Sequence, residues 1–391
     1  MLKFERKIGE WIEQNIYMIS VIAVTIIGVL IRYALRDFES ADYQGFLSIW
    51  YEQIRQGGGI RALNMQVGNY NFLYQLLIAL LTYIPIEPLY AYKILSCIFD
   101  FLLAGVIVEL VRTLNGRKVD LFIVYTIVLM SPQIFLNSAA WAQCDSIYVF
   151  FVSMSLLAFI KEKPIVAMIM YGFAFALKLQ AVFFLPFCLF IYLVRKKFSF
   201  MAFGCIPVVM IVTSIPALIA GRNVKELYWV YQKQVVQYKS VQMNYPSFWV
   251  ILNNSQNETN WEAFKTMAVA VTIGVLGVMM ALIIINKVHL SHKNILYFAF
   301  MFVYAIVLFL PAMHERYGYM YEVLAIAIVG VNKKTTLLLA ILTYISCCTY
   351  GCYLYGTEIN IGILSVINIV TFLMYLYVLG HDMSSEDRQE A

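Results

Sequence analysis

Apolar stretches of about 20 residues recur along the whole sequence, and each is long enough to cross a bilayer as a helix. The composition agrees with this pattern, since 62% of the residues are hydrophobic and only 13% are charged. Soluble domains carry about 25% charged residues. The chain is therefore predicted to be a polytopic membrane protein, which excludes a soluble enzyme, a nucleic-acid-binding protein and a disordered chain.

Polar residues, glycine and proline separate the apolar stretches into twelve candidate spans. The predicted fold is all-α, with about twelve transmembrane helices in a single transmembrane domain over residues 1–391. The predicted spans are 15–35, 89–112, 119–136, 146–160, 164–179, 181–195, 199–220, 263–286, 294–311, 317–331, 335–353 and 361–379.

The short loops between these spans differ in positive charge, provided that a further apolar run at 70–84 does not cross. One set of loops, with both termini, then holds sixteen Lys and Arg residues, and the other holds only Lys178 and Arg316. Positive charge marks the cytoplasmic side. Both termini, including the tail 380–391, are therefore predicted to be cytoplasmic. A crossing at 70–84 would invert every later loop, so this run is predicted to be a re-entrant or juxtamembrane helix.

Two long loops, 36–88 and 221–262, are predicted to face outward. Both are rich in Trp, Tyr, Asn and Gln, which suit a membrane interface and hydrogen bonding to polyols. The charge rule does not apply to loops of this length, so their cations are free for other roles.

An amphipathic helix is predicted near the start of the first long loop. Phe46, Ile49, Trp50 and Ile54 recur at helical spacing with polar residues between them. Such a helix is suited to lie flat on the outer leaflet.

The seven cysteines are odd in number and lie mostly in apolar runs, without a CxxC or Cys/His metal spacing. They are interpreted as small apolar residues of the core rather than as a disulfide or zinc framework.

Ionisable groups near membrane depth are costly, so the polar clusters between spans are candidate functional sites. The first cluster follows the first span and contains Asp37, Glu39 and Asp42. It is either a solvated loop start or the position of a general base, for which Asp42 is the best candidate because it begins the amphipathic helix. The spacing from Asp37 to Asp42 matches no recognised metal cage, so a divalent metal stays open and none is assigned.

The second cluster runs from Trp141 to Ser146. Asp145 either caps the following helix or contacts a substrate. Trp141 and Gln143 are residue types that suit a sugar face and its hydroxyl groups.

The third and fourth clusters supply cations. Lys178, two residues before Gln180, either extends toward lipid headgroups or neutralises a phosphate. The fourth cluster, His314, Glu315 and Arg316, is either a purely structural group of polar contacts or a phosphate-binding site. The planar arginine cation is suited to phosphate oxygens.

Asp100 is a lone acid in the middle of a predicted span. It is expected to hydrogen-bond a neighbouring helix, or Lys93 through a polar path, rather than to take part in chemistry. The four clusters together favour a substrate with an anionic head and an apolar tail, such as a lipid phosphate that carries a sugar.

These residues carry a resemblance to the GT-C superfamily of polytopic glycosyltransferases, which use polyprenyl-phosphate sugars. The run Ser40–Gln44, followed by Trp50-Tyr51, resembles the acidic motif in that family's first outer loop. Asn69–Leu73 is similar to its later Tyr-Pro-Pro-type segment but lacks both prolines. Leu177–Gln180 is similar to the Lys-Gln motif of the eukaryotic glucosyltransferase branch with one residue inserted, and His314–Arg316 to its His-Glu-Lys motif.

The resemblance covers about residues 30–330 and implies an inverting transfer of a hexose, with juxtamembrane helices in the first outer loop. Asp42 would deprotonate the acceptor hydroxyl, and Arg316, Lys178 and His314 would bind the donor phosphate. The residues assigned to the sugar and the acceptor are Asp37, Tyr70, Trp141, Gln143, Asp145, Gln180 and Glu315.

The short length is similar to bacterial members, for which the carrier would be undecaprenyl phosphate in the cell membrane. The acceptor would then be a polysaccharide, a teichoic acid or a glycolipid. Membrane lipid is the other expected partner, and nucleic acid is not one. The main alternative is a transporter or flippase of lipid-linked sugars, but such proteins usually show paired repeats, and none is evident here. A polysaccharide polymerase or ligase is the alternative among enzymes.

Overall fold

The computed structural model describes residues 3–114, 116–252 and 260–390. These residues form helices, with two isolated bridges between Met243–Asn244 and His314 and no named strand. The predicted all-α fold is therefore confirmed for the described chain. Its α-helices are α1 (Lys3–Ala34), α2 (Ser48–Gln56), α3 (Phe72–Leu81), α4 (Pro88–Thr113), α5 (Lys118–Met130), α6 (Pro132–Phe135), α7 (Asp145–Ile160), α8 (Pro164–Leu177), α9 (Leu185–Arg195), α10 (Cys205–Ile219), α11 (Val224–Val236), α12 (Trp249–Leu252), α13 (Trp261–Ile285), α14 (His292–Phe309), α15 (Tyr319–Val331), α16 (Thr336–Tyr355) and α17 (Ile361–Glu390).

Short 3-10 or π-helical turns extend or connect several of these helices. They are η1 (Tyr43–Leu47), η2 (Gly59–Asn64), η3 (Leu136–Ala140), η4 (Leu179–Phe184), η5 (Phe200–Gly204) and η6 (Lys333–Thr335). The two π-helical turns are η1 and η3.

Seven helices in the described chain are long and apolar enough to cross a membrane, and a bent pair made by α5 with 132–140 would be an eighth. The break in this pair bends by 46° and falls at Ser131-Pro132, where proline cannot continue a hydrogen-bonded helix. Five further apolar helices are shorter than 18 residues. All twelve predicted spans coincide with helical segments, but helix length does not confirm twelve crossings.

Two of the short helices, α7 and α15, lie in the protein core beside the longer α14. Every residue of α15 except Val331 is buried, and α7 and α14 are buried along most of their length. α15 packs so closely on its neighbours that a Cβ added at Gly330 would lie 2.8 Å from side-chain atoms of Val111 and Val124. With 13 residues, α15 is only about 20 Å long, against about 30 Å for a hydrocarbon core.

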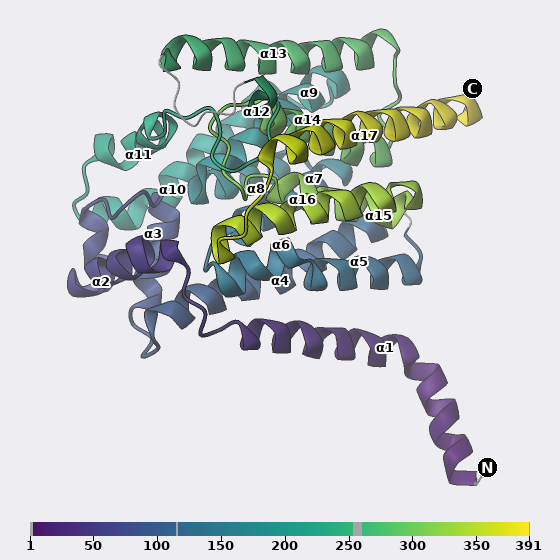
Figure 1. Cartoon of the computed structure of the whole chain (residues 1–391), viewed down its shortest axis with the longest axis horizontal. Coiled ribbons are helices and arrows are strands. Elements are labelled where there is room, and N and C mark those ends of the chain that lie inside the picture. The colour runs from purple at the N-terminus through teal and green to yellow at the C-terminus, as the bar shows by residue number, and fades with distance from the viewer. Residues whose placement is uncertain (1–2, 115, 253–259, 391) are drawn as a thin grey trace.

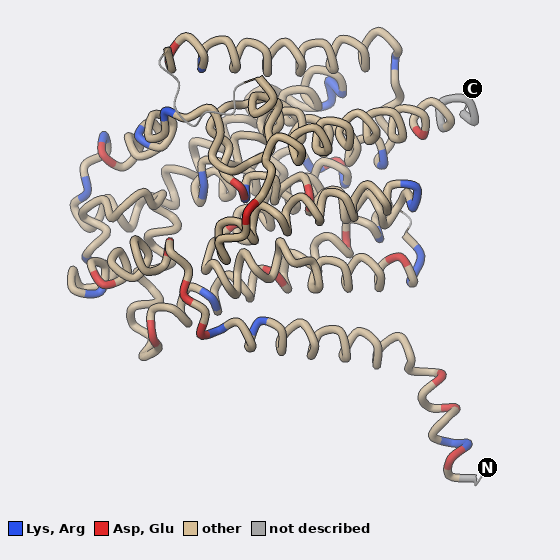
Figure 2. Tube along the Cα trace, viewed as in Figure 1, with Lys and Arg blue, Asp and Glu red and all other residues tan. Residues whose placement is uncertain are grey.

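The helices run roughly side by side, with α1 and α13 on opposite outer edges (Figure 1). Both chain termini lie at one end, here called the terminal end, and α2, α3 and α11 lie at the other, here called the long-loop end. Charged residues lie mostly at these two ends, and the middle of the helices is largely uncharged (Figure 2). The two termini therefore share one end of the bundle, as the charge pattern predicts.

Ion pairs join neighbouring helices at the terminal end. Glu109 at the end of α4 accepts from Lys161 at the end of α7 at 2.6 Å, and Asp120 of α5 pairs with Lys333 of η6 at 3.0 Å. Lys293 of α14 pairs with Asp382 of α17 at 2.9 Å. Basic residues that mark a side of the membrane in the sequence thus also connect helix ends.

At the long-loop end, amide side chains connect the two long loops. Gln234 of α11 donates to the backbone oxygen of Asn69 at 2.7 Å and to Asn71 Oδ1 at 2.9 Å. The buried Arg222 donates to Gln75 Oε1 at 3.0 Å and also to Gln66 Oε1. Much of the Asn and Gln content that suited polyol binding therefore holds one loop against the other.

Three predicted boundaries differ from the structure. The amphipathic segment is split between η1 and α2, and Ile54 is fully buried, whereas Phe46 and Ile49 are exposed, so these residues do not form one lipid-facing stripe. The helix within 70–84 is α3, whose ten residues span about 15 Å. α17 continues through the predicted tail to Glu390. Residues 253–259 of the second long loop lie outside the described residues.

Candidate active site

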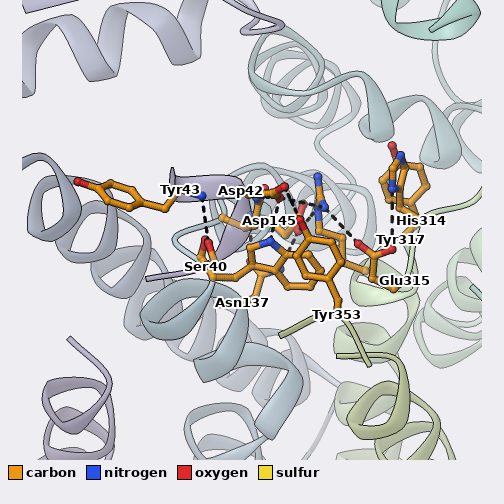
Figure 3. Close-up of polar contacts among 12 residues, drawn as sticks. Ser40, Asp42, Tyr43, Asn137, Asp145, His314, Glu315, Tyr317 and Tyr353 are labelled. Atoms are coloured by element: carbon orange, nitrogen blue, oxygen red, sulfur yellow. Dashed lines mark hydrogen bonds and ion pairs between the residues drawn. The ribbon is translucent and has the colours of Figure 1, made fainter. Parts of the chain in front are cut away.

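Asp42 lies in the first turn of the helix that begins the first long loop. The hydroxyl of Ser40 accepts a hydrogen bond from the backbone N–H of Tyr43 at 3.2 Å, which is the N-cap arrangement (Figure 3). Ser40 also donates to the backbone oxygen of Trp141 at 3.1 Å. Ser40 therefore both caps the start of this helix and fixes it to the loop before α7. Asp42, in the first turn, lies where the helix dipole favours a negative charge.

Three side chains donate hydrogen bonds to the Asp42 carboxylate. Trp141 Nε1 and Gln143 Nε2 both donate to Oδ2 at 2.8 Å, and the Tyr353 hydroxyl donates to Oδ1. Ala142, between the first two donors, has a φ of 60°, a left-handed conformation that is unfavourable for a residue with a Cβ. This strained turn directs the side chains on either side of it, Trp141 and Gln143, onto one oxygen atom of Asp42.

Arg316 lies among three carboxylates without a short contact to any of them. Its Nη1 is 3.8 Å from Asp42 Oδ2 and 3.6 Å from Glu315 Oε1, and its Nε is 3.6 Å from Asp145 Oδ2. These distances exceed hydrogen-bond length, and the buried Nε has no hydrogen-bond partner. The guanidinium also lies over the Trp141 ring, 5.2 Å from its centroid. The three carboxylates raise the pKa of Arg316 although burial opposes its charge.

Asp145 is the first residue of α7, but its carboxylate does not cap the helix. Oδ1 accepts from Lys178 Nζ, and Oδ2 accepts from Asn137 Nδ2 at 2.8 Å. The capping interpretation of Asp145 is therefore wrong, because its oxygens are directed toward the cations and the amide. Asn137 belongs to the π-helical turn η3, and such turns occur frequently at functional sites.

A polar cavity of about 320 Å³ opens beside Asp42 and Arg316. It is lined by Asp42, Tyr238, Ser240, Gln242, Met243, Asn244, His314, Glu315, Arg316 and Tyr353. Residues 238–244, here called the strap, run along the loop that follows α14. The N–H of Met243 donates to the backbone oxygen of Met313 at 3.2 Å, and that of Ala312 to Val241 at 3.1 Å. Asn244 and Ala312 also have positive φ, at 60° and 58°.

Burial changes the protonation of the two residues before Arg316. It lowers the pKa of His314 to about 3, and the nearby cations of Arg316 and Lys178 act in the same direction. His314 is therefore a neutral imidazole near pH 7. Burial raises the pKa of Glu315 to about 7, although Arg316 opposes this change. Glu315 therefore titrates close to neutrality.

Most of the predicted site residues lie together, but several do not line the cavity. Tyr70 is buried with its hydroxyl 2.7 Å from that of Tyr92, and Asp37 is an exposed residue paired with Arg36 at 3.0 Å. Gln180 donates to the Tyr317 hydroxyl at 2.8 Å, next to the cavity residues. Neither Tyr70 nor Asp37 is brought to the cavity.

Asp100 bonds to neighbouring helices, as predicted, but its ionic partner is Arg32 rather than Lys93. Arg32 Nη2 is 2.8 Å from Asp100 Oδ2, which also accepts from the Ser138 hydroxyl at 2.5 Å. Lys93 instead donates to backbone oxygens at the end of α1, with a distance of 2.6 Å to that of Phe38.

Tyr353 and the strap are the parts of the site that the sequence analysis missed. Strap residues are ordinary loop residues in a region whose path the sequence does not fix. Tyr353 had a signal, since Ser346, Thr349, Tyr350 and Tyr353 place polar groups on one face of an apolar span.

The described residues contain no group of three or more His, Cys, Asp and Glu that could hold a metal ion. The seven cysteines are free thiols. The site therefore presents a hydrogen-bonded carboxylate, a cation with unused donors and an amide-lined cavity. This combination can accept a proton from a hydroxyl group and stabilise an anionic leaving group.

A comparison with protein families confirms the predicted resemblance. The model of glycosyltransferase family 87 matches residues 70–311, which is more than half of the chain. This range includes Trp141, Asp145, Lys178 and the strap, and it excludes Asp42 and Arg316. No curated protein matches the sequence. The chain therefore belongs to glycosyltransferase family 87, a family of GT-C-type membrane glycosyltransferases.

Proposed function

We propose that this glycosyltransferase moves a hexose from a polyprenyl phosphate to an acceptor hydroxyl, with inversion at the anomeric carbon. The acceptor oxygen forms a bond to the anomeric carbon while its proton passes to Asp42. The bond from that carbon to the phosphate oxygen breaks, and polyprenyl phosphate leaves with the electron pair. Asp42 acts as the general base, and Arg316 stabilises the charge that grows on the phosphate.

The observation that carries this proposal is the position of Asp42 and Arg316 on one cavity, with Nη1 and Oδ2 3.8 Å apart. A base and an anion-stabilising cation must act on atoms of the same reacting centre, so a shared cavity is the first requirement. The long contacts of Arg316 are the second, because its N–H groups remain available to phosphate oxygens.

The two cations have different roles in this proposal. Lys178 is committed to Asp145 by a direct ion pair and does not line the cavity. It therefore holds Asp145 beneath Arg316, and the donor phosphate is assigned to Arg316. His314, neutral near pH 7, contributes a hydrogen bond rather than a charge.

Sugar recognition is assigned mainly to the strap. Trp141 is fully buried, with Tyr353 stacked on its ring at 4.2 Å, so it has no free face for a sugar and instead holds Asp42. Ser240, Gln242 and Asn244 line the cavity with hydroxyl and amide groups, which match sugar hydroxyls in both donor and acceptor capacity.

The location follows the charge pattern of the loops. In this proposal the long-loop end faces the outside of the cell membrane, both termini are cytoplasmic and the chain crosses twelve times. The carrier is undecaprenyl phosphate, and the acceptor is a cell-surface polysaccharide, a teichoic acid or a glycolipid. The short central helices support this placement, because α7 and α15 are shorter than the hydrocarbon core and leave room for polar loops at their outer ends.

The test is an assay of the purified chain with a panel of polyprenyl-phosphate hexoses that carry a labelled sugar. Glycolipid and simple glycoside acceptors are supplied in detergent and in vesicles. We expect one donor to release polyprenyl phosphate while its label enters a new product. Label that changes leaflet but stays on its carrier would identify a transporter and overturn the proposal, as would intact donors throughout the panel.

A further inference from the structure

α16 carries a polar stripe that contacts Asp42, Glu315 and Glu322 directly and reaches Asp145 through Asn137. Ser346, Thr349, Tyr350 and Tyr353 occupy positions i, i+3, i+4 and i+7, which face the same way on a helix. Ser346 donates to Glu322, and Thr349 donates to the backbone oxygen of Glu315 at 3.3 Å. The Tyr350 hydroxyl accepts from Asn137 at 3.1 Å, and Asn137 also donates to Asp145.

Tyr353 ends this stripe at the candidate base. Its hydroxyl donates to Asp42 Oδ1, while its ring stacks on Trp141 with an interplanar angle of 18°. Trp141 in turn donates to Asp42 Oδ2. Tyr353 therefore acts on both carboxylate oxygens, on one directly and on the other through the ring that it supports.

We propose that Tyr353 is a positioning residue for Asp42. It fixes the rotation of the carboxylate and, through its hydrogen bond, stabilises the ionised form that accepts the proton. This inference rests on the proposed function in assigning the base to Asp42. It goes beyond that function because Tyr353 lies outside the matched range 70–311 and outside every motif of the sequence analysis.

Other titratable groups also face Asp42 and must stay in place during a test. Arg316 and Glu315 approach from the loop before α15, and Tyr238 approaches from the strap. Asp145 lies behind Arg316. A change of Tyr353 to phenylalanine leaves all of these groups and the stacked ring in position and removes only one hydroxyl.

The decisive measurement is the infrared signature of the Asp42 carboxylate. Difference spectra of the full-length protein identify the Asp42 band by its loss in Asp42→Asn. A carboxylate that loses a hydrogen bond to Oδ1 changes its stretching frequency, so we expect the Asp42 band to shift in Tyr353→Phe. Tyr355→Phe is the matched control, because this exposed tyrosine near the end of α16 packs its ring on Phe38.

The activity of the same variants gives a second readout with the donor that the wild type uses. We expect kcat in Tyr353→Phe to fall about tenfold and the donor KM to stay within about twofold. An unshifted Asp42 band, or a raised KM with an unchanged kcat, would overturn the positioning role. If Asp42→Asn keeps full activity, the base assignment fails, and the role of Tyr353 fails with it. If Asp42→Asn is inactive but the Asp42 band does not shift in Tyr353→Phe, only the inference about Tyr353 fails.

Discussion

The two ends of the bundle use the same charged residue types in different ways. At the terminal end, Glu109 and Glu162 are partly exposed, and each accepts from two cations at 2.6 to 3.2 Å. At the long-loop end, the side chains of Asp145, Glu315 and Arg316 are exposed by only 2%, 3% and 16%, and the arginine contacts are 3.6 Å or longer. The partly exposed pairs of the terminal end are thus close, as are the buried pairs Arg32–Asp100 and Lys178–Asp145, whereas Arg316 is buried among carboxylates and makes only long contacts.

This difference indicates which charges are available for binding. Solvated ion pairs contribute little stability and can be satisfied side by side. A buried arginine that neutralises three carboxylates without hydrogen-bonding any of them keeps its directional N–H groups for another ligand. The ion pairs of the terminal end therefore hold helices together. At the long-loop end, Arg316 remains available to bind an anionic ligand.

The largest stability difference is expected between buried and exposed arginines. Arg32 pairs with the fully buried Asp100 inside the helices, so Arg32→Ala leaves an unpaired buried charge and should destabilise the protein by about 3–5 kcal/mol. Arg112, exposed beside Glu109, should cost about 0–1 kcal/mol when changed to alanine. Unfolding of both variants in detergent measures the difference, and equal losses would contradict the comparison.

The next largest effect is expected on catalysis at Arg316. Arg316→Ala removes the only cation that lines the cavity in the described chain, so turnover should fall by about 10²–10³ and the donor should bind more weakly. Arg112→Ala serves here too as the control from the terminal end and should leave both quantities unchanged. Unaltered donor affinity in Arg316→Ala would remove the phosphate assignment.

Glu315 is expected to produce a smaller, pH-dependent effect. Burial raises its pKa to about 7, so the carboxyl is neutral below this pH and gains a negative charge above it. That charge lies 3.6 Å from Arg316 and competes with the donor phosphate. The donor KM should therefore rise by about threefold to tenfold as the pH passes through 7, and Glu315→Gln should show no rise. A rise of equal size in both proteins would assign the titration to another group.

The smallest effect is expected at Lys161, whose ion pair with Glu109 is partly exposed. Lys161→Ala should change the unfolding free energy by about 0–1 kcal/mol and leave turnover at the wild-type level. A loss of turnover would show that the terminal end also contributes to the site.

The fold class followed from the sequence because the energetics of membrane burial apply to each apolar stretch separately. The number of crossings did not, since α7 and α15 are short helices buried by their neighbours, and hydropathy does not distinguish them from full spans. Nothing in the sequence indicates that the two long loops pair, so their Asn and Gln content was interpreted as suited to polyols, whereas Gln234 bonds to Asn71 and Arg222 to Gln75.

The site was predictable where local charge made residues conspicuous. Asp42, Asp145 and Arg316 lie in loops between apolar spans, where a charge is costly unless it has a function, and the structure brings them together. Tyr353 and Asn244 are uncharged, so only three-dimensional packing shows that they line the same cavity. Tyr70 was predicted as a site residue because it lies in a segment that resembles a family motif, and Asp37 because it lies in a polar cluster. Neither residue lines the cavity.

The most direct test of the account is the turnover of Asp42→Asn, with Asp120→Asn from the terminal end as its control. Asparagine keeps the size and polarity of Asp42 but cannot take up the proton. With the donor that the wild type uses, we predict that Asp42→Asn loses transfer while it remains folded and binds the donor, and that Asp120→Asn transfers sugar normally. Wild-type transfer by Asp42→Asn would contradict the assignment of the long-loop end as the catalytic centre.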